Sequence, residues 1–385
     1  MPLKIVIAPD SFKGSLKSPE VARAIAAGVR AALPDAVIVE LPVGDGGEGT
    51  LDALVTATSG TFETHVVTGP LGEPVTARLG LLGDGETVFV EMAEASGLSL
   101  VPAAERDPYR ATTYGTGELI RAALATGRKR LLIGIGGSAT NDGGAGALQA
   151  LGVRLLDQDG RELPPGGTPL RQLAAIDLGS FQIPDGLEII AACDVTNPLT
   201  GPEGASAIYG PQKGASPEGI ANLDAALTHY ADISAAKLGK QWKDTPGAGA
   251  AGGLGFALLA FLGARLERGV QLVLDAVQFE SHLEDADLVL TGEGRIDRQT
   301  TAYGKTLTGI GERARRAGVP VLALAGSVSD DLGDYRQAGI CGVASVIPRP
   351  MTLEDAMRTG AALVEDASRR MVEVFVAGRG TPSPP

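Results

Sequence analysis

The sequence is poor in the residues that build covalent and metal-bound frameworks. Its 385 residues include two cysteines and three histidines, and aromatic residues make up 4% of the chain. Cys193 and Cys341 provide no disulfide framework for so long a chain, and no histidine stands at a spacing typical of zinc ligands. These counts exclude a disulfide-stabilised secreted domain and argue against a zinc site. The sequence therefore predicts a reducing, cytoplasmic environment.

Long apolar runs are also missing. No stretch approaches the ~20 apolar residues that cross a bilayer. A strand pattern is present by Ile5, which leaves no room for a signal peptide. The formal net charge is −13, and an acidic chain repels nucleic acid and anionic membrane surfaces. We expect a cytoplasmic protein with no nucleic-acid or membrane partner; its oligomeric state stays open.

Glycine, in contrast, is abundant, with 54 residues, about twice the usual share of roughly 7%. Three glycine- and acid-rich segments each follow a strand-like run: Gly134–Gly146, Gly44–Thr50 and Thr291–Asp297. Loops of this kind bind phosphate because little but backbone crowds the anion, and a following helix offers its positive end. Three such segments together predict a phosphate and metal site.

The order of apolar patterns predicts an α/β fold. A strand over 4–8, a helix over 18–33 and a strand over 36–43 indicate a doubly wound, mainly parallel sheet. Short alternating runs between Thr61 and Leu98 predict antiparallel hairpins, and the α/β alternation resumes from Ala286.

These patterns predict a discontinuous Rossmann-like domain with a second domain inserted into it. The first consists of residues 1–67 plus 285–378, and a mixed α/β domain is inserted at 68–284. Residues 379–385 are expected to be a disordered tail. The ligand site is expected in the cleft between the two domains.

Two nucleotide-binding fingerprints are approached but not met. Gly134-x-Gly136-x-x-Ala139 has the dinucleotide spacing, yet Thr-Asn-Asp-Gly-Gly stands where a helix should begin. Gly304-Lys305-Thr306 resembles the end of a P-loop, but Gln299 replaces the glycine required five residues earlier. A Walker A loop is therefore absent. An NAD-dependent oxidoreductase of a small hydroxy acid and a non-catalytic sensor of a phosphorylated metabolite remain the alternatives to a kinase.

The chain is rich in the groups that phosphoryl transfer requires. Kinase chemistry needs phosphate-binding loops, a cation and a base for the attacking hydroxyl. Acids in or beside glycine or strand-end loops are Asp45, Glu48, Asp142, Asp194, Glu293 and Asp297. Cations in loops are Lys13, Lys213, Arg295 and Lys305. Each acid could instead cap a turn, and each cation could be a solvated surface charge.

Seven ordered motifs resemble those of the bacterial glycerate kinases of the glycerate 2-kinase type. They begin at Pro9, Gly44, Gly134, Cys193, Gly210, Gly247 and Thr291 and read PDSFKGS, GDGGEGT, GIGGSATNDGGAG, CDVTNPL, GPQKG, GAGAAGGLG and TGEGRID. The resemblance runs from residue 4 to about residue 375. It implies a two-domain α/β enzyme of glyoxylate or sugar-acid breakdown that phosphorylates D-glycerate with ATP and Mg²⁺. The product is 2-phosphoglycerate or, because both hydroxyls lie close to the carboxylate, 3-phosphoglycerate.

If the chain is a glycerate kinase, the chemistry of each candidate side chain suggests its role. The ATP phosphates are expected on Gly136, Gly137, Ser138, Thr140 and Asn141. Mg²⁺ is expected on Asp142 and Glu293. Asp194 or Asp297 would accept the hydroxyl proton. The glycerate carboxylate is expected on Ser11, Lys13 and Arg295.

Overall fold

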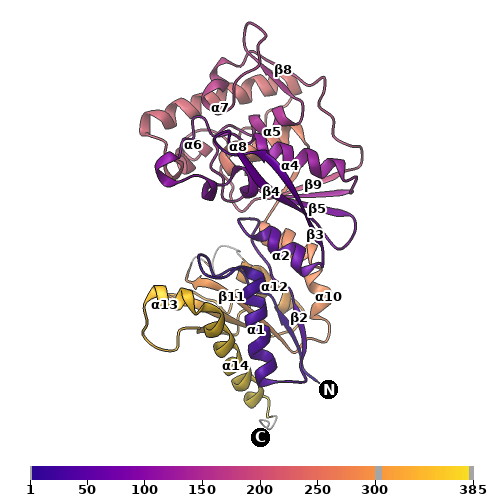
Figure 1. The fold of residues 1–385 in the computed structure, drawn as a ribbon, viewed down its shortest axis with the longest axis vertical. Helices are drawn as coiled ribbons and strands as arrows, with labels where there is room; N and C mark the ends of the chain where they lie inside the picture. Colours follow the sequence, from indigo (N-terminus) through magenta and orange to yellow (C-terminus); the bar gives the residue numbers. More distant parts are fainter. Residues whose placement is uncertain (1, 299, 301–305, 381–385) are drawn as a thin grey trace. The chain divides into compact units, whose positions relative to one another are not determined.

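The chain is organised in two compact units. The computed structural model describes residues 2–298, 300 and 306–380. The first unit consists of Met1–Asp45, Asp52–Ser59 and Val270–Pro385, and the second of Gly46–Leu51 and Gly60–Gly269. Figure 1 shows the ribbon coloured along the sequence. Of the tail expected to be disordered, residues 381–385 lie outside the described part of the chain.

The first unit is built on a five-stranded parallel sheet in the order β13-β12-β11-β1-β2. Its strands are β1 (Lys4–Ile7), β2 (Val37–Glu40), β11 (Leu288–Ile296), β12 (Val321–Val328) and β13 (Gly342–Ser345). Its helices are α1 (Ser18–Ala32), α12 (Thr306–Arg316), α13 (Leu353–Arg358), α14 (Gly360–Gly378) and α10 (Phe279–Leu283). Helices α2 (Thr50–Ala57) and α9 (Gly269–Ala276) begin in the second unit and continue into the first.

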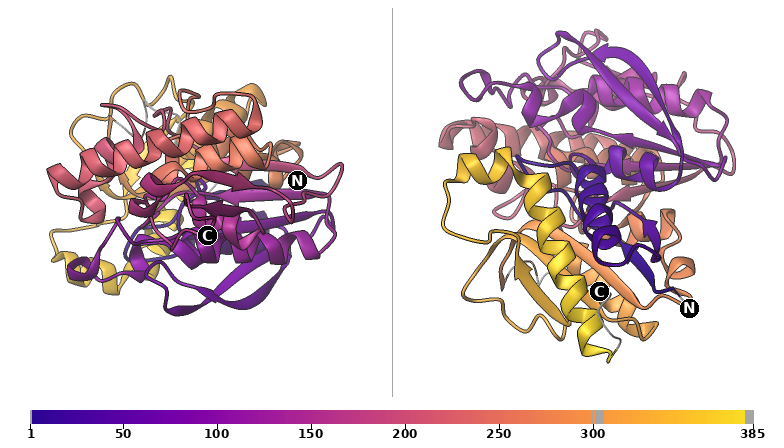
Figure 2. Two further views of the ribbon diagram at one scale, coloured as in Figure 1. Left: turned by 90° about the horizontal axis from the view of Figure 1, so that it is seen from above. Right: turned by 60° about the horizontal axis from the view of Figure 1, so that its bottom comes forward.

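Both faces of this sheet are covered. Ile5 and Ile7 lie in one core with residues of α1 and α14, which run side by side (Figures 1 and 2). Val6 and Val289, whose side chains point to the opposite face, are equally buried. Burial on both faces requires an apolar run in each strand, which is why the sequence of β1 lacks polar alternation. The predicted doubly wound α/β fold is confirmed.

The strand order has a switch point between β1 and β11. From β1 the chain winds one way to β2, and from β11 it winds the other way through β12 to β13. The carboxyl ends of β1 and β11 therefore lie side by side at this point. In doubly wound sheets, ligands bind at such switch points.

The second unit contains a six-stranded mixed sheet in the order β10-β9-β6-β5-β4-β3. Its strands are β3 (Thr61–Thr68), β4 (Pro74–Leu81), β5 (Thr87–Glu91), β6 (Arg130–Gly134), β9 (Glu188–Ala192) and β10 (Arg265–Glu267). β5, β6, β9 and β10 are parallel, whereas β3, β4 and β5 are antiparallel, as the hairpin pattern indicates. β3 was assigned by sequence to the first domain, but it pairs with β4 in this unit.

The remaining elements surround this sheet. The α-helices are α3 (Ala93–Ser96), α4 (Tyr114–Ala125), α5 (Ala145–Ala150), α6 (Ala205–Tyr209), α7 (Pro217–Leu238) and α8 (Ala250–Phe261). A small antiparallel pair is formed by β7 (Arg154–Leu156) and β8 (Ala175–Asp177). Short 3₁₀ helices span Leu98–Leu100, Ala103–Glu105, Thr168–Gln172 and Pro211–Lys213. In the part of the chain that is described, no helix has the length and apolar character needed to cross a bilayer.

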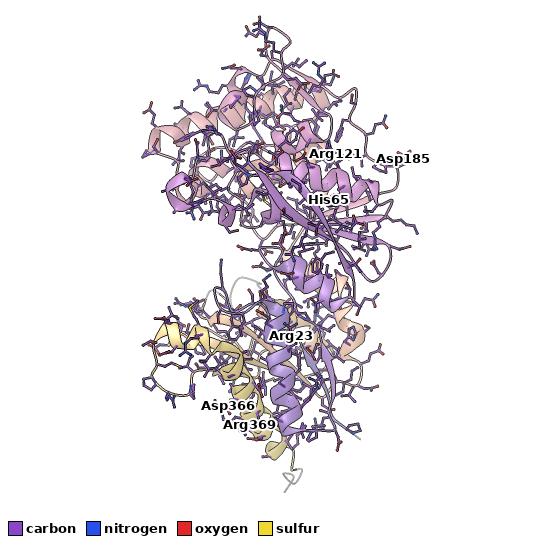
Figure 3. The ribbon with its side chains drawn as sticks, viewed as in Figure 1. Arg23, His65, Arg121, Asp185, Asp366 and Arg369 are labelled. Atoms are coloured by element: carbon purple, nitrogen blue, oxygen red, sulfur yellow. The ribbon has the colours of Figure 1, made fainter. Side chains whose placement is uncertain are left out.

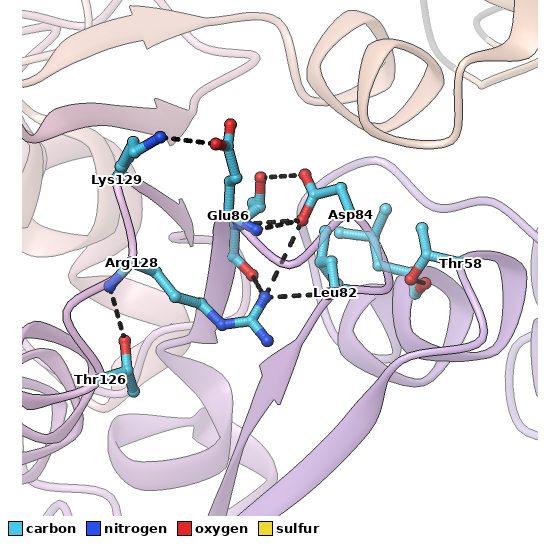
Figure 4. A network of polar contacts seen from close by, with 9 residues as sticks. Thr58, Leu82, Asp84, Glu86, Thr126, Arg128 and Lys129 are labelled. Carbon is cyan, nitrogen blue, oxygen red and sulfur yellow. Dashed lines mark hydrogen bonds and ion pairs between the residues drawn. The ribbon is translucent and has the colours of Figure 1, made fainter.

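Figure 4 shows how the β4–β5 turn is held. Asp84 accepts hydrogen bonds from the backbone N–H groups of Glu86 and Thr87, both at 2.9 Å. The guanidinium of Arg128 donates to the carbonyls of Leu82 and Thr87 at 2.9 and 2.7 Å. This polar network holds the β4–β5 turn against the amino-terminal end of β5.

Candidate functional site

The loop after β1 lies directly over β11 at the switch point of the first unit. Asp10 donates its backbone N–H to the Gly292 carbonyl at 2.8 Å. A Cβ atom built on Gly294 would lie 3.2 Å from the backbone nitrogen of Lys13, so glycine there permits the close approach. The structure thus brings the predicted substrate residues Ser11 and Lys13 to the strand that carries Glu293 and Arg295.

The third glycine segment is a strand. The glycines after Thr291 predict a loop, but β11 continues to Ile296 and pairs with β12, with Glu293 opposite Ala325 and Arg295 opposite Ser327. Its glycines have low strand propensity, which hid the strand from sequence reasoning. Glu293 is half-buried and Arg295 is exposed. As residues two apart in a strand, they share one face of the sheet.

Asp10 is the carboxylate that sequence reasoning missed. One of its oxygens accepts from the Ser11 backbone N–H at 2.6 Å, and the other accepts from the Thr306 hydroxyl at 2.7 Å. Burial and the nearby negative charge of Asp45 raise the pKa of Asp10 to about 6. A carboxyl group tuned toward neutral pH is typical of a general base. Its position after an apolar strand was the available signal, but sequence alone does not show burial.

Asp297 and Arg295 form an ion pair at the end of β11. The two side chains approach to 3.2 Å, with Arg295 70% exposed. Asp297 also accepts from the Thr300 backbone N–H at 3.1 Å. Asp297 therefore has local contacts with Arg295 and with the backbone that follows. Its assignment as the base stays a prediction.

The other two glycine segments meet in the second unit. Gly136 donates its N–H to the Gly46 carbonyl at 3.3 Å, and a Cβ built on Gly136 would lie 2.7 Å from the Cα of Gly47. Side chains larger than hydrogen would separate the two loops at this point. Glu91, 2% exposed, accepts from the N–H groups of Gly49 and Leu51 at 2.9 and 2.8 Å.

Most of the Gly134–Gly146 segment is buried. Gly137, with φ of +78°, is exposed, and Gly136 is half-buried. Ser138 is 7% exposed, while Thr140 and Asn141 have no exposed surface. Only the turn at Gly136 and Gly137 is therefore open to a ligand in this structure. The segment that the sequence predicts as an accessible phosphate-binding loop is therefore mostly part of the buried interior of the second unit.

Asp142 has an internal role that differs from the predicted one. It is completely buried and accepts from Thr113 N and Oγ1, both at 2.8 Å, and from Gly144 N and Gly146 N at 3.1 and 3.2 Å. Burial raises its pKa, and these hydrogen bonds oppose that shift. With no exposed surface, Asp142 offers no oxygen to a Mg²⁺ ion in this structure, and its assignment as a metal ligand stays a prediction. Its carboxylate accepts from Gly144 N and Gly146 N at the start of α5, the N–H groups that the sequence predicts as phosphate donors.

Two further glycines in the Gly247–Gly255 motif support this segment from α8. Gly252, with φ of +66°, would place a Cβ 1.9 Å from the Thr140 carbonyl oxygen. Gly253 would place one 2.7 Å from the Cα of Gly143. The backbone of α8 therefore touches the backbone of the loop, which only glycine allows.

Lys213 is buried beneath the same segment, with 1% of its surface exposed. Its Nζ donates to Ser138 Oγ and to the Thr140 carbonyl, both at 2.6 Å. Burial lowers the pKa of Lys213 to about 7, and the negative charge of Asp142 acts in the opposite direction. Among the described residues, Thr140 Oγ1 and Asn141 Oδ1 are buried without a hydrogen-bond partner.

Asp194 lies at the carboxyl end of β9. Its side chain is exposed, and Oδ1 accepts from the Gly269 backbone N–H at 2.9 Å, at the start of α9. This contact gives Asp194 a capping role, and its assignment as the base remains a prediction. Asp194 and Asp297 belong to different units, as do Asp142 and Glu293.

Histidines have local structural contacts. His65, on β3 (Figure 3), lies 3.6 Å from the Glu63 carboxylate, and His229 Nε2 lies 2.7 Å from the Leu173 carbonyl. Burial and the positive charge of Lys4 lower the pKa of His282. Within the described ranges, no three His, Cys, Asp or Glu residues form a group suited to a metal ion. This does not disfavour Mg²⁺, which takes one or two carboxylates together with substrate phosphates.

Neither nucleotide fingerprint is supported. After Ala139 the chain continues as a loop to Gly144, and α5 starts at Ala145 and has six residues. A dinucleotide fingerprint requires a helix that begins at its third position, so the NAD interpretation is disfavoured. Gly304 and Lys305 of the P-loop-like triplet lie outside the described residues.

The fold and its loops define an α/β protein with polar side chains at the carboxyl ends of parallel strands, an arrangement common in phosphate-binding enzymes. Residues 5–376 match the model of the glycerate kinase family. The chain is 54% identical to a glycerate kinase of Bacillus subtilis (strain 168), covering 95% of this chain and 96% of the relative. It is 51% identical to a glycerate 2-kinase of Escherichia coli (strain K12), covering 98% and 99%.

A solved structure agrees with the sequence relatives. The crystal structure of a protein described as glycerate kinase 2 from Salmonella typhimurium LT2 matches with a TM-score of 0.90 and 51% identity, covering 99% of this chain and all of that one. The chain therefore belongs to the glycerate kinase family, and it is a kinase.

The role of Asp142 can be tested by unfolding. We expect Asp142→Ala to lower the free energy of unfolding by about 2–4 kcal/mol, because buried N–H groups lose their acceptor. Urea titration measures this, with the exposed Asp185→Ala (Figure 3) as a control that changes stability by less than about 0.5 kcal/mol. Unchanged stability together with a loss of Mg²⁺ dependence would restore Asp142 as a metal ligand.

Proposed function

We propose that this enzyme phosphorylates D-glycerate with ATP and Mg²⁺ to give 2-phosphoglycerate and ADP. The observation that carries the proposal is the group at the β1–β11 switch point. There the loop of Asp10, Ser11 and Lys13 lies over the strand of Glu293 and Arg295. The named relatives support the substrate, and the printed name of the Escherichia coli relative supports the 2-hydroxyl.

In this proposal the glycerate carboxylate binds to Lys13 and Arg295, with Ser11 as a neutral donor. Both cations are exposed at the sheet edge, and a guanidinium can hold a carboxylate through two parallel hydrogen bonds. Asp297 holds Arg295 in place through their ion pair. These cations offset the repulsion that a chain of net charge −13 exerts on an anionic substrate.

Asp10 is proposed as the acceptor of the hydroxyl proton. With a pKa of about 6 it is mostly ionised at neutral pH, yet basic enough to hold the proton during transfer. The hydrogen bonds from Ser11 and Thr306 hold its carboxylate in place. Asp194 and Asp297, the two candidates from the sequence, also accept backbone hydrogen bonds. The hydroxyl donor to Asp10, in contrast, comes from Thr306, in a distant segment of the chain.

The remaining carboxylate of the predicted metal pair is Glu293, which is half-buried on β11. It fits a Mg²⁺ ion that is held mainly by phosphate oxygens and water. When bound, Mg²⁺ neutralises charge on the phosphates. ATP phosphates are assigned to Gly136 and Gly137, with Ser138, Thr140 and Asn141 behind them.

The activity itself is tested by ADP release with Mg-ATP and four acceptors in parallel: D-glycerate, L-glycerate, glycolate and lactate. We expect turnover with D-glycerate alone, and ³¹P NMR of the product should show phosphate on the 2-hydroxyl. A 3-phosphate would correct the regiochemistry. Binding of phosphorylated compounds without any turnover would instead identify a sensor.

The proton acceptor is tested by the pH dependence of catalysis. We expect wild-type kcat/KM to fall as the pH drops through about 6, because Asp10 becomes protonated. Asp10→Asn should lower kcat by ~10²–10⁴. Asp45→Asn should move the acid limb to lower pH, because it removes a charge that raises the pKa of Asp10. The exposed Asp35→Asn serves as the control. Near-normal turnover of Asp10→Asn would assign the base to Asp194 or Asp297.

Arg295 is tested by separating KM from kcat. If it binds the glycerate carboxylate, Arg295→Ala should raise the KM for glycerate about tenfold or more and leave the KM for ATP unchanged. The exposed Arg23→Ala on α1 (Figure 3) removes the same charge and should change neither constant. A loss confined to kcat would place Arg295 on the transferred phosphoryl group instead.

A further inference from the structure

Lys213 is an unusual component of the second unit because lysine is rarely buried completely. It ends the 3₁₀ helix Pro211–Lys213 and precedes Gly214, whose φ of +98° is in the left-handed region. A Cβ on Gly214 would lie 2.7 Å from the Arg106 carbonyl oxygen. Arg106 Nη1 in turn donates to the Gln212 carbonyl at 3.1 Å. The backbone around Lys213 is therefore anchored on both sides, and the ammonium group is held inside.

Local structure does not require a charged group at this position, although burying an ammonium group costs free energy. A neutral donor could satisfy the Thr140 carbonyl, and an isolated buried charge is unfavourable unless it is paired. Asp142 supplies a negative charge, but its oxygens are occupied by hydrogen bonds from Thr113, Gly144 and Gly146. A cation placed here without a direct carboxylate partner favours an anion at the neighbouring turn.

The contact with Ser138 determines where its hydroxyl proton points. In its charged form Lys213 only donates, so Ser138 Oγ accepts from it in their 2.6 Å hydrogen bond. A hydroxyl has a single proton, which is then available to donate in another direction. The hydrogen bond from Lys213 is the one contact of Ser138 Oγ among the side-chain hydrogen bonds of the described residues. Ser138 directly follows Gly137, the exposed residue of the turn.

The turn itself is held in place by backbone hydrogen bonds. Leu98 donates to the Gly137 carbonyl at 2.7 Å, and Ala139 donates to the Ser96 carbonyl at 2.9 Å. Asn141 Nδ2 donates to Ser206 Oγ at 2.9 Å, and Ser206 lies on α6, which precedes the Lys213 segment. The hydroxyl of Ser138 is thus presented from a fixed backbone.

We infer that Lys213 is a positioning residue for phosphate recognition, which acts by fixing the hydroxyl of Ser138 as a donor to a phosphoryl group at the Gly136–Gly137 turn. The inference rests on the proposed function, because it assumes that ATP phosphates bind at this turn. The charge of Lys213 also polarises the Ser138 hydroxyl and strengthens its hydrogen bond to an anion. A bound anion would favour the charged form of Lys213, whose pKa burial has lowered to about 7.

A double-mutant cycle tests whether Lys213 acts through Ser138. Mg-ATP binding is measured by calorimetry for the wild type, Lys213→Met, Ser138→Ala and the double variant, with thermal unfolding to show that each is folded. We expect each single change to weaken ATP binding about tenfold or more. The double variant should bind no more than about twofold more weakly than the weaker single variant, because the two residues form one unit.

Lys237→Met is the matched control. Lys237 is exposed near the end of α7, and the change removes the same single charge from the second unit. Its ATP affinity should stay within about twofold of the wild type, since a distant exposed charge is largely screened. A weakening as large as that of Lys213→Met would show that net charge, not the contact with Ser138, sets the affinity.

The remaining outcomes decide between positioning and mere structural support. Lys213→Met with a lower melting temperature but wild-type ATP affinity would overturn the inference, and so would effects that multiply fully in the double variant. If Lys213→Met does not fold, Ser138→Ala still decides, because wild-type affinity in that variant contradicts the inference. A wild type that binds ATP but does not turn over glycerate would refute the proposed function alone. Absence of ATP binding by the wild type would refute both.

Discussion

The second unit depends on the use of buried carboxylates as acceptors for bare backbone N–H groups. Glycine-rich segments leave their N–H groups unshielded, and a buried N–H without an acceptor costs free energy. Asp142 receives the N–H groups of Gly144 and Gly146, and Glu91 receives those of Gly49 and Leu51. The exposed Asp194 accepts in the same way from the Gly269 N–H at the start of α9.

This constraint explains why the acids accompany the glycines. Glycine allows backbone segments to touch, as Gly136 does with Gly47 and Gly252 with Thr140. Close contact excludes water, so the N–H groups at these points need protein acceptors. A carboxylate from a neighbouring strand end satisfies two of them at once. The glycines and acids that indicate a phosphate site in the sequence therefore have a structural role in the loops themselves.

The sequence was informative about elements and motifs because these depend on local patterns. The βαβ order, the helix over 18–33 and the hairpins between Thr61 and Leu98 follow from periodicity and turn residues, and the structure confirms them. The continuation of β11 through Gly292 and Gly294 could not be read, because pairing with β12 outweighs the low strand propensity of glycine. Family membership followed from motif order and is confirmed by the comparisons.

The roles of individual acidic residues could not be predicted from the sequence. Asp142 and Asp10 both follow strands, and burial raises the pKa of each, yet Asp142 has no exposed surface and accepts four hydrogen bonds, whereas Asp10 accepts two, from Ser11 and Thr306. Burial and hydrogen-bond partners, which arise from residues far apart in the chain, separate the two cases. Thr306, for example, lies almost three hundred residues after Asp10 and donates to it.

The central claim is that Asp10, at the β1–β11 switch point, is the carboxylate prepared to take the substrate proton. The most direct measurement is a ¹³C NMR titration of the aspartate carboxyl groups, in which the Asp10→Asn variant identifies the Asp10 signal. We expect a midpoint of about 6. A midpoint in the ordinary aspartate range, at about 4, would contradict it.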